Sequence, residues 1–242
     1  MLGRKGLRLL LSYLPPEWKG RLRTHLGGPD LRWSLRQLAR FGFAPKTVTD
    51  VGAFHGDWTR ICLEIFPKAE ITCVEPQEEA KFILSELTSA YTNVRAIQIL
   101  LGKEVSNSIP FTEEGPGSSV LGNGLKRSRR SMTTLDNLIE TGVSKPPQLL
   151  KLDVQGYETE ILKGYTKYFH SCEVIQCELS LLPLLTDAPL LDEVVSYLRQ
   201  RDFVMFDIEE IIQAPSDGAV WQIDALFCRK DSPLRTERMW RR

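Results

Sequence analysis

The chain has 242 residues, of which 42% are hydrophobic, 26% charged and 9% aromatic, which is the composition of an ordinary globular protein. A chain of this length buries a substantial core, so its folding needs neither a disulfide framework nor a structural metal. Lysine plus arginine and aspartate plus glutamate each number 31, a balance that argues against a general polyanion-binding protein.

Positive charge is concentrated at the two ends of the chain. Residues 1–40 carry nine Lys/Arg and two acidic residues, for a net charge of +7, and residues 229–242 have a net charge of +4. Residues 1–45 predict a helical, basic N-terminal segment, with leucines at helical spacing that include Leu31, Leu35 and Leu38. We favour a lid packed against the rest of the protein, and the alternative is peripheral contact with an anionic membrane through residues 1–28.

No sorting or spanning segment is recognisable. The apolar stretch Leu9–Leu14 is ended by two prolines and is too short for an export signal, and no stretch approaches the roughly 20 apolar residues of a membrane span. The five cysteines form no CxxC pair, and the three histidines lack metal-ligand spacing. We therefore expect a cytoplasmic protein that needs no metal.

From residue 47 onward, β-rich segments alternate with helical patterns, which is typical of a parallel sheet covered on both faces. The predicted strands are Thr47–Val51, Glu70–Glu75, Asn93–Ile99, Gln148–Val154 and Glu173–Leu179, and helices are expected at about 57–66, 77–89, 135–141, 157–164 and 189–201. Two further strands, Phe203–Ile212 and Val220–Arg229, predict an antiparallel hairpin at the edge of the sheet. Residues 102–132 predict an inserted loop or a small hairpin. The expected domain spans residues 46–230, and a basic tail, 231–242, follows it.

A glycine turn joins the first strand to the first helix of this domain. The segment Asp50–Thr59 reads DVGAFHGDWT, in which Gly52 and Gly56 allow a tight turn and a close approach of a ligand to the backbone. A dinucleotide fingerprint starting at Gly52 would need glycine where Phe54 and Asp57 stand. The turn therefore suits a nucleotide-like ligand with less phosphate to bind than a dinucleotide.

Acidic residues end several of the predicted strands. Glu75 follows Asp50 by 25 residues, close to the spacing of about 20 residues at which such folds bind ribose hydroxyls. Asp153 and Glu178 end two neighbouring strands, at the sheet edge where open α/β sheets bind ligands. They could orient or deprotonate a hydroxyl, and His55 is a weaker third candidate. The structural alternatives are a surface carboxylate at a strand end for Asp50 and Glu75 and a helix cap for Asp153.

Together these segments resemble the FkbM family, a branch of the class I S-adenosylmethionine-dependent methyltransferases. The similar pieces are DVGAFHGDWT at 50–59, CVEPQ at 73–77, GSSVL at 117–121, MTTLDNLI at 132–139, LLKLDVQGYE at 149–158 and QCELS at 176–180. The resemblance implies a Rossmann-like, doubly wound α/β fold, with a mostly parallel seven-stranded sheet that ends in an antiparallel hairpin. It also implies S-adenosylmethionine bound at Asp50, Gly52, Gly56 and Glu75.

The same resemblance implies O-methylation of a hydroxyl on a sugar, glycolipid, polyketide or other small molecule. Asp153 is the first candidate for the catalytic base and Glu178 the second. Ser118 and Ser119 in the inserted segment are candidate substrate contacts, or they only form a turn.

Three other functions are compatible with parts of the sequence to different degrees. A catalytically inactive methyltransferase fold that serves as a binding or membrane-associated scaffold would share every cofactor residue. An NAD-dependent dehydrogenase is disfavoured by the broken glycine fingerprint. Binding of nucleic acid is disfavoured because the basic run Lys126–Arg130 contains no aromatic residue on which a base could stack.

Overall fold

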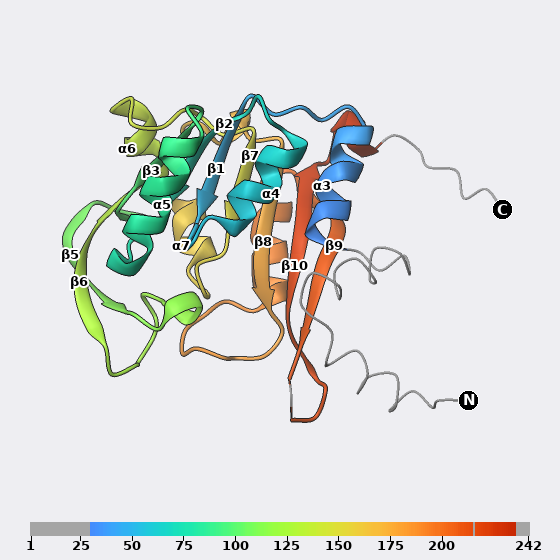
Figure 1. Cartoon of the computed structure of the whole chain (residues 1–242). Helices are drawn as coiled ribbons and strands as arrows, with labels where there is room; N and C mark the ends of the chain where they lie inside the picture. Colours follow the sequence, from blue (N-terminus) through green and yellow to red (C-terminus); the bar gives the residue numbers. More distant parts are fainter. Residues whose placement is uncertain (1–29, 215, 236–242) are drawn as a thin grey trace, which may run out of the picture.

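The protein is described by a computed structural model that covers residues 30–214 and 216–235 (Figure 1). The segment 1–28, predicted to contact a membrane, therefore lies outside the described residues. A single seven-stranded sheet runs through the domain in the order β3-β2-β1-β7-β8-β10-β9. The sheet strands are β1 (Thr47–Val51), β2 (Glu70–Val74), β3 (Val94–Ile97), β7 (Leu149–Leu152), β8 (Val174–Ser180), β9 (Phe203–Gln213) and β10 (Val220–Arg229).

The direction of the strands confirms the predicted fold class. Strands β3, β2, β1, β7 and β8 are parallel neighbours, and β10 is antiparallel to both β8 and β9. The order reverses between β1 and β7, so the carboxyl ends of these two central strands flank the crevice at which open α/β sheets bind ligands.

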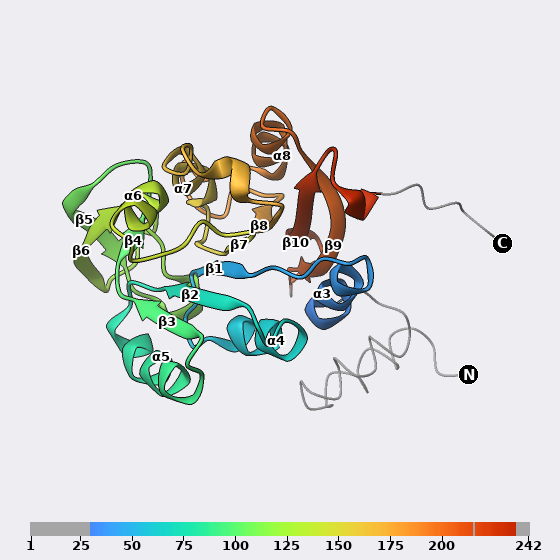
Figure 2. The same ribbon diagram turned by 90° about the horizontal axis from the view of Figure 1, so that it is seen from above.

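Helices cover both faces of the sheet, as Figure 2 shows from above. One face carries α3 (Leu31–Arg40), α4 (Asp57–Ile65) and α5 (Glu78–Ala90), and the other carries α6 (Leu135–Glu140), α7 (Glu158–Lys163) and α8 (Leu191–Arg199). Helix α3 corresponds to the helix expected from the spacing of Leu31, Leu35 and Leu38, and the last two are fully buried. Among the described residues, no helix is long and apolar enough to cross a membrane.

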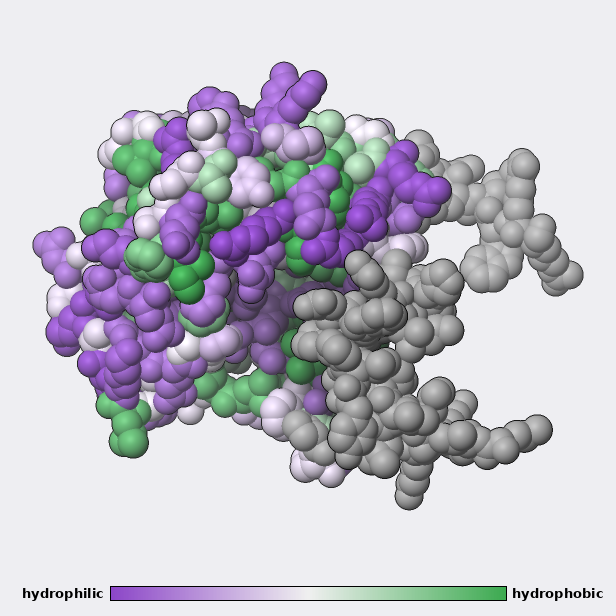
Figure 3. Space-filling view, viewed as in Figure 1, coloured by the Kyte–Doolittle hydropathy of each residue, from purple (hydrophilic) through white to green (hydrophobic). Residues whose placement is uncertain are grey.

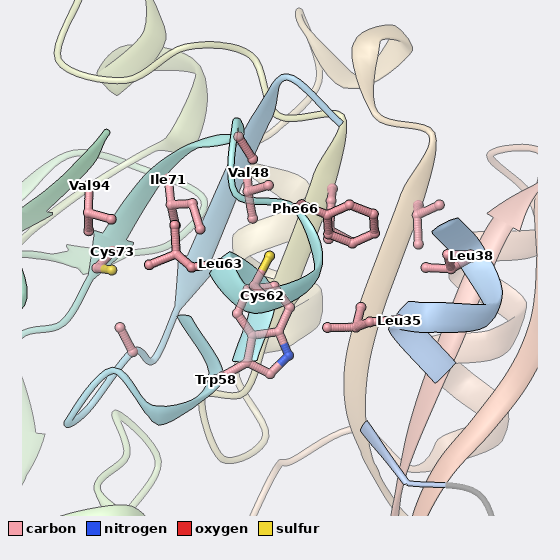
Figure 4. Close-up of a cluster of buried hydrophobic side chains, with 14 of the residues drawn as sticks. Leu35, Leu38, Val48, Trp58, Cys62, Leu63, Phe66, Ile71, Cys73 and Val94 are labelled. Atoms are coloured by element: carbon pink, nitrogen blue, oxygen red, sulfur yellow. The ribbon is translucent and has the colours of Figure 1, made fainter. Parts of the chain in front are cut away.

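Each helix layer packs on a separate hydrophobic core. On the α3–α5 face, Trp58, Cys62 and Phe66 project from the region of α4 toward strand residues and toward Leu35 of α3 (Figure 4). On the other face, the apolar side chains of β7 and β8 pack with those of α6, α7 and α8. The alternation of buried side chains along β7 places Leu150 and Leu152 on this second face, and so turns Lys151 toward the α4 side.

The segment expected as a loop or small hairpin is a small second sheet. Strands β5 (Ser106–Thr112) and β6 (Arg127–Thr133) pair antiparallel, and β4 (Leu100–Leu101) pairs with β6. Between β5 and β6, a 3-10 turn at Gly115–Gly117 lies beside the carboxyl ends of the main strands.

Candidate functional site

A cavity of about 210 Å³ lies at the carboxyl ends of β1, β2 and β7. Gly52 forms part of its wall and takes a positive φ of +75°. A Cβ atom at this position would lie 1.9 Å from the backbone oxygen of Asp153, so the turn after β1 and the end of β7 approach as closely as they do only because residue 52 is glycine. Figure 3 shows a hollow near the centre of the α4 face, bordered mainly by hydrophilic residues.

Glu75 lies in the wall of this cavity with only 3% of its surface exposed. One carboxylate oxygen, Oε2, accepts a hydrogen bond of 2.9 Å from the backbone N–H of Phe54, and Oε1 accepts one of 2.9 Å from Gln77. Burial raises the pKa of Glu75, and the two backbone donors oppose that rise. The carboxylate thus ties the glycine turn to the end of β2 and keeps unused acceptor positions for a ligand.

The 3-10 turn of the inserted segment closes one side of the cavity. Gln77 donates from Nε2 to the backbone oxygen of Gly115 at 3.2 Å, and the Ser118 hydroxyl donates to Gln77 Oε1 at 2.8 Å. Ser119 donates to the backbone oxygen of Gln155 at 2.9 Å. Both predicted serines therefore hold the inserted segment against the central strands, and direct contact between either serine and a substrate stays a prediction.

Beneath the cavity, Lys151 forms the centre of a buried polar network. Its Nζ lies 3.1 Å from Asp50 Oδ1 and 3.3 Å from Asp153 Oδ2, and it donates to the backbone oxygen of Gly52 at 2.8 Å. Asp50 is fully buried and also accepts a hydrogen bond of 2.7 Å from the Thr59 hydroxyl. Burial lowers the pKa of Lys151, but the carboxylates of Asp153 and Asp50 outweigh that effect and hold it above its ordinary value.

A second cavity, of about 240 Å³, adjoins the first on the α4 side of the sheet. Four residues line both cavities, namely Asp57, Trp58, Lys151 and Asp153. The carboxylates that line only the second cavity are Glu178, Glu209, Glu210 and Asp224. The side chain of Asp153 is 42% exposed and borders both cavities. It therefore lies where molecules bound in the two cavities would meet.

Glu178 is held beside Asp153 by the intervening Gln155. The amide Nε2 of Gln155 donates to Glu178 Oε2 at 2.9 Å and lies 3.5 Å from Asp153 Oδ1. Gln155 has a positive φ of 53°, an uncommon conformation for a residue other than glycine and one that often marks a functional site. Burial, together with the negative charges of Asp153, Glu158 and Asp224, raises the pKa of Glu178 to about 9. These surroundings therefore favour the protonated form of the Glu178 carboxyl group.

The structure brings four of the eight predicted site residues to the first cavity, namely Gly52, Glu75, Ser118 and Asp153. Glu178 lines the second cavity. Asp50, Gly56 and Ser119 line neither cavity, and their predicted contacts with cofactor or substrate stay predictions. His55 also lines the first cavity, with its ring stacked on that of Phe54 at a centroid distance of 3.7 Å.

Several polar residues of the site were missed by the sequence reasoning. Lys151 could have been recognised, since a lysine inside a four-residue buried strand needs an acidic partner, and Asp50 is its partner in the register of β1 and β7. Glu158 is buried and accepts hydrogen bonds from the backbone of Val154 and Gly156 at 3.2 Å, so it shapes the turn after β7. Glu209 and Asp224 carry no signal in the sequence, because the pattern of the hairpin predicts only the edge of a sheet.

Comparisons with known proteins identify a family and a relative to which the chain is similar. The family model for the methyltransferase FkbM domain matches residues 50–205. The hexuronic acid methyltransferase AglP of Haloferax volcanii is 28% identical over 198 residues, which cover 76% of this chain and 79% of that protein.

Two solved structures are among those to which the chain is similar. A 1,6-didemethyltoxoflavin-N1-methyltransferase of Burkholderia thailandensis is 12% identical, with a TM-score of 0.48 and coverage of 90% of this chain and 91% of that one. A precorrin-6y C5,15-methyltransferase of Geobacter metallireducens is 10% identical, with a TM-score of 0.46 and coverage of 82% and 87%. The family match covers more than half of the chain and includes the glycine turn, Glu75 and Asp153. The protein therefore belongs to the FkbM family of methyltransferases.

Proposed function

We propose that the protein transfers a methyl group from S-adenosylmethionine to a hydroxyl group of a sugar or a similar small polyhydroxylated molecule. The observation that carries this proposal is the position of Asp153, a partly exposed carboxylate at the junction of the two cavities. The likeness to a hexuronic acid methyltransferase supports a sugar as the acceptor.

The residues of the first cavity fit S-adenosylmethionine, which supplies a methyl group bound to a positively charged sulfur. Glu75 offers a buried carboxylate to the ribose hydroxyls, and Gly52 leaves room for close approach of the ligand to the backbone. The apolar wall formed by Ile99, Leu101 and Phe111 suits the adenine ring.

Positioning provides most of the expected rate enhancement, because methyl transfer is an in-line displacement that needs two groups held in the correct orientation. Asp153 accepts the proton of the acceptor hydroxyl, and a general base of this kind typically contributes on the order of 10²–10⁴-fold. Lys151 holds the Asp153 carboxylate in place, with 3.3 Å between Nζ and Oδ2. Glu178, whose surroundings favour the protonated form, donates a hydrogen bond that orients the acceptor.

Replacement of Asp153 by asparagine tests this assignment. The change keeps the side-chain shape and removes the base, so kcat should fall by about 10²–10⁴-fold while the affinity for S-adenosylhomocysteine stays within a few-fold of wild type. Transfer of a labelled methyl group to a panel of sugars measures the first quantity, and titration calorimetry measures the second. Asp187→Asn, a change in the loop after β8 that lines neither cavity, is the control. An Asp153→Asn enzyme with wild-type kcat would refute the role of base, and absence of transfer by wild type to every hydroxyl acceptor would favour a scaffold.

A further inference from the structure

The second cavity contains more carboxyl groups than a proton-transfer step needs. Glu178 of β8 stands directly opposite Asp224 of β10 in the antiparallel ladder. Two acidic side chains at directly opposed positions destabilise a sheet when both are ionised. Burial, with Asp153 and Glu210 nearby, raises the pKa of Asp224 to about 7. The opposed pair is therefore unfavourable unless a proton or a bound cation offsets the charge.

Glu209 adds a third buried carboxyl group from the neighbouring strand. In the pairing of β9 with β10, Asp224 stands opposite Glu210 and Ala225 opposite Ile208, so Glu209 is the extra residue of a β-bulge. It is 1% exposed, and neither of its oxygens accepts a hydrogen bond of normal geometry, although the Gln176 amide is close enough to lower its pKa. A bulge redirects a side chain, and here it turns an unpartnered carboxyl group into the wall of the cavity.

Among the described residues that line this cavity, the one cation is already engaged. Lys151 is held by Asp50, Asp153 and the backbone oxygen of Gly52. It therefore balances the carboxylates at the junction of the two cavities and leaves Asp224 and Glu209 without a positive partner among the residues that the structure describes. An unpaired acidic group in a buried position is costly unless a cation or a proton neutralises it.

We propose that this cavity binds a protonated amino group of the acceptor, so that the substrate is an amino sugar or a similar polyhydroxylated amine. The inference rests on the proposed function, since it describes the acceptor of the same reaction. A protonated amine has no free electron pair and is not methylated, so the neighbouring hydroxyl at Asp153 remains the nucleophile. A hexuronic acid carries a carboxylate, which the same cavity would repel.

The test is titration calorimetry of the full chain, loaded with S-adenosylhomocysteine, against three sugars of similar size. Glucosamine carries the ammonium group, N-acetylglucosamine has the same ring without the charge, and glucuronate carries the opposite charge. Glucosamine should bind at least about tenfold more tightly than N-acetylglucosamine, and glucuronate should bind more weakly than either. Glu209→Gln and Asp224→Asn should each reduce the preference for glucosamine severalfold, and Glu86→Gln, at an exposed position on α5, should leave it unchanged.

Three results of these titrations would refute the amine site. Equal affinity for glucosamine and N-acetylglucosamine, no binding of glucosamine, or an unchanged preference in both cavity variants would overturn the proposal. Saturation of the site by Mg²⁺ in competition with glucosamine would assign it to a metal ion and would also overturn it. Binding of glucosamine by a protein that does not bind S-adenosylhomocysteine would leave the amine site standing and refute the proposed transfer reaction.

Discussion

Replacement of Lys151 by methionine is the sharpest test of the polar network beneath the site. Methionine fills a similar volume but leaves the Asp50 carboxylate, which has no exposed surface, without its positive partner. Removal of one member of a buried ion pair typically costs about 3–5 kcal/mol, because the other charge stays buried and uncompensated. In a domain of this size each kcal/mol lowers Tm by about 2–4 °C, so we expect Tm to fall by roughly 6–20 °C.

Equilibrium unfolding in urea measures this loss, with two matched variants. Lys145→Met breaks the exposed pair of Lys145 with Glu70 and should change stability little, because exposed pairs are screened by solvent. The double variant Lys151→Met/Asp50→Asn removes both buried charges and should recover at least half of the loss. Wild-type stability in Lys151→Met, or a double variant less stable than the single one, would refute the assignment of Lys151 as the partner that makes a buried Asp50 tolerable.

Three further predictions concern the walls of the site. Gly52→Ala should destabilise the protein far more than Gly42→Ala in thermal unfolding, since both residues have positive φ but only the Cβ at 52 meets a backbone atom. Burial and like charges raise the pKa of Glu178 to about 9 in the folded state. The unfolded chain loses this proton at the lower, ordinary pKa of a glutamate, so the free energy of unfolding falls as the pH rises from the unfolded to the folded pKa. Glu178→Gln should therefore gain stability relative to wild type on going from pH 5 to pH 9 in urea unfolding, and a constant difference would contradict the shift. Ser118→Ala should loosen the 3-10 turn and weaken binding of S-adenosylhomocysteine severalfold without a comparable loss of Tm; unchanged affinity would show that this tether is dispensable.

The parts of the fold that follow from local rules were predictable from the sequence. The period and length of the apolar segments indicated the strands. The glycine turn and Glu75 indicated the edge of the sheet at which a cofactor would bind, because a close approach to the backbone and an acidic residue at a strand end can both be recognised in the local sequence. The family resemblance implied the number of strands and the cofactor. The structure confirms the seven strands, and the family match confirms a methyltransferase.

The remaining parts depend on pairing between distant strands. A cofactor contact of Asp50 stays a prediction, and its ion pair with Lys151 follows from the register of β1 with β7, which the local sequence does not set. The bulge that turns Glu209 inward arises from the pairing of β9 with β10 and has no counterpart in the local sequence. Ser118 and Ser119 were candidate substrate contacts, and their hydrogen bonds to Gln77 and Gln155 are visible only once the inserted segment is placed against the main sheet.

Titration calorimetry with S-adenosylhomocysteine, with NAD as the control ligand, tests the central claim most directly because it needs no knowledge of the acceptor. We expect micromolar binding of S-adenosylhomocysteine, no binding of NAD, and a loss of at least about tenfold in affinity in Glu75→Ala, which removes a carboxylate that also orders the glycine turn. A folded protein that does not bind S-adenosylhomocysteine, or a Glu75→Ala variant that binds it as tightly as wild type, would contradict the assignment of the first cavity as the cofactor site.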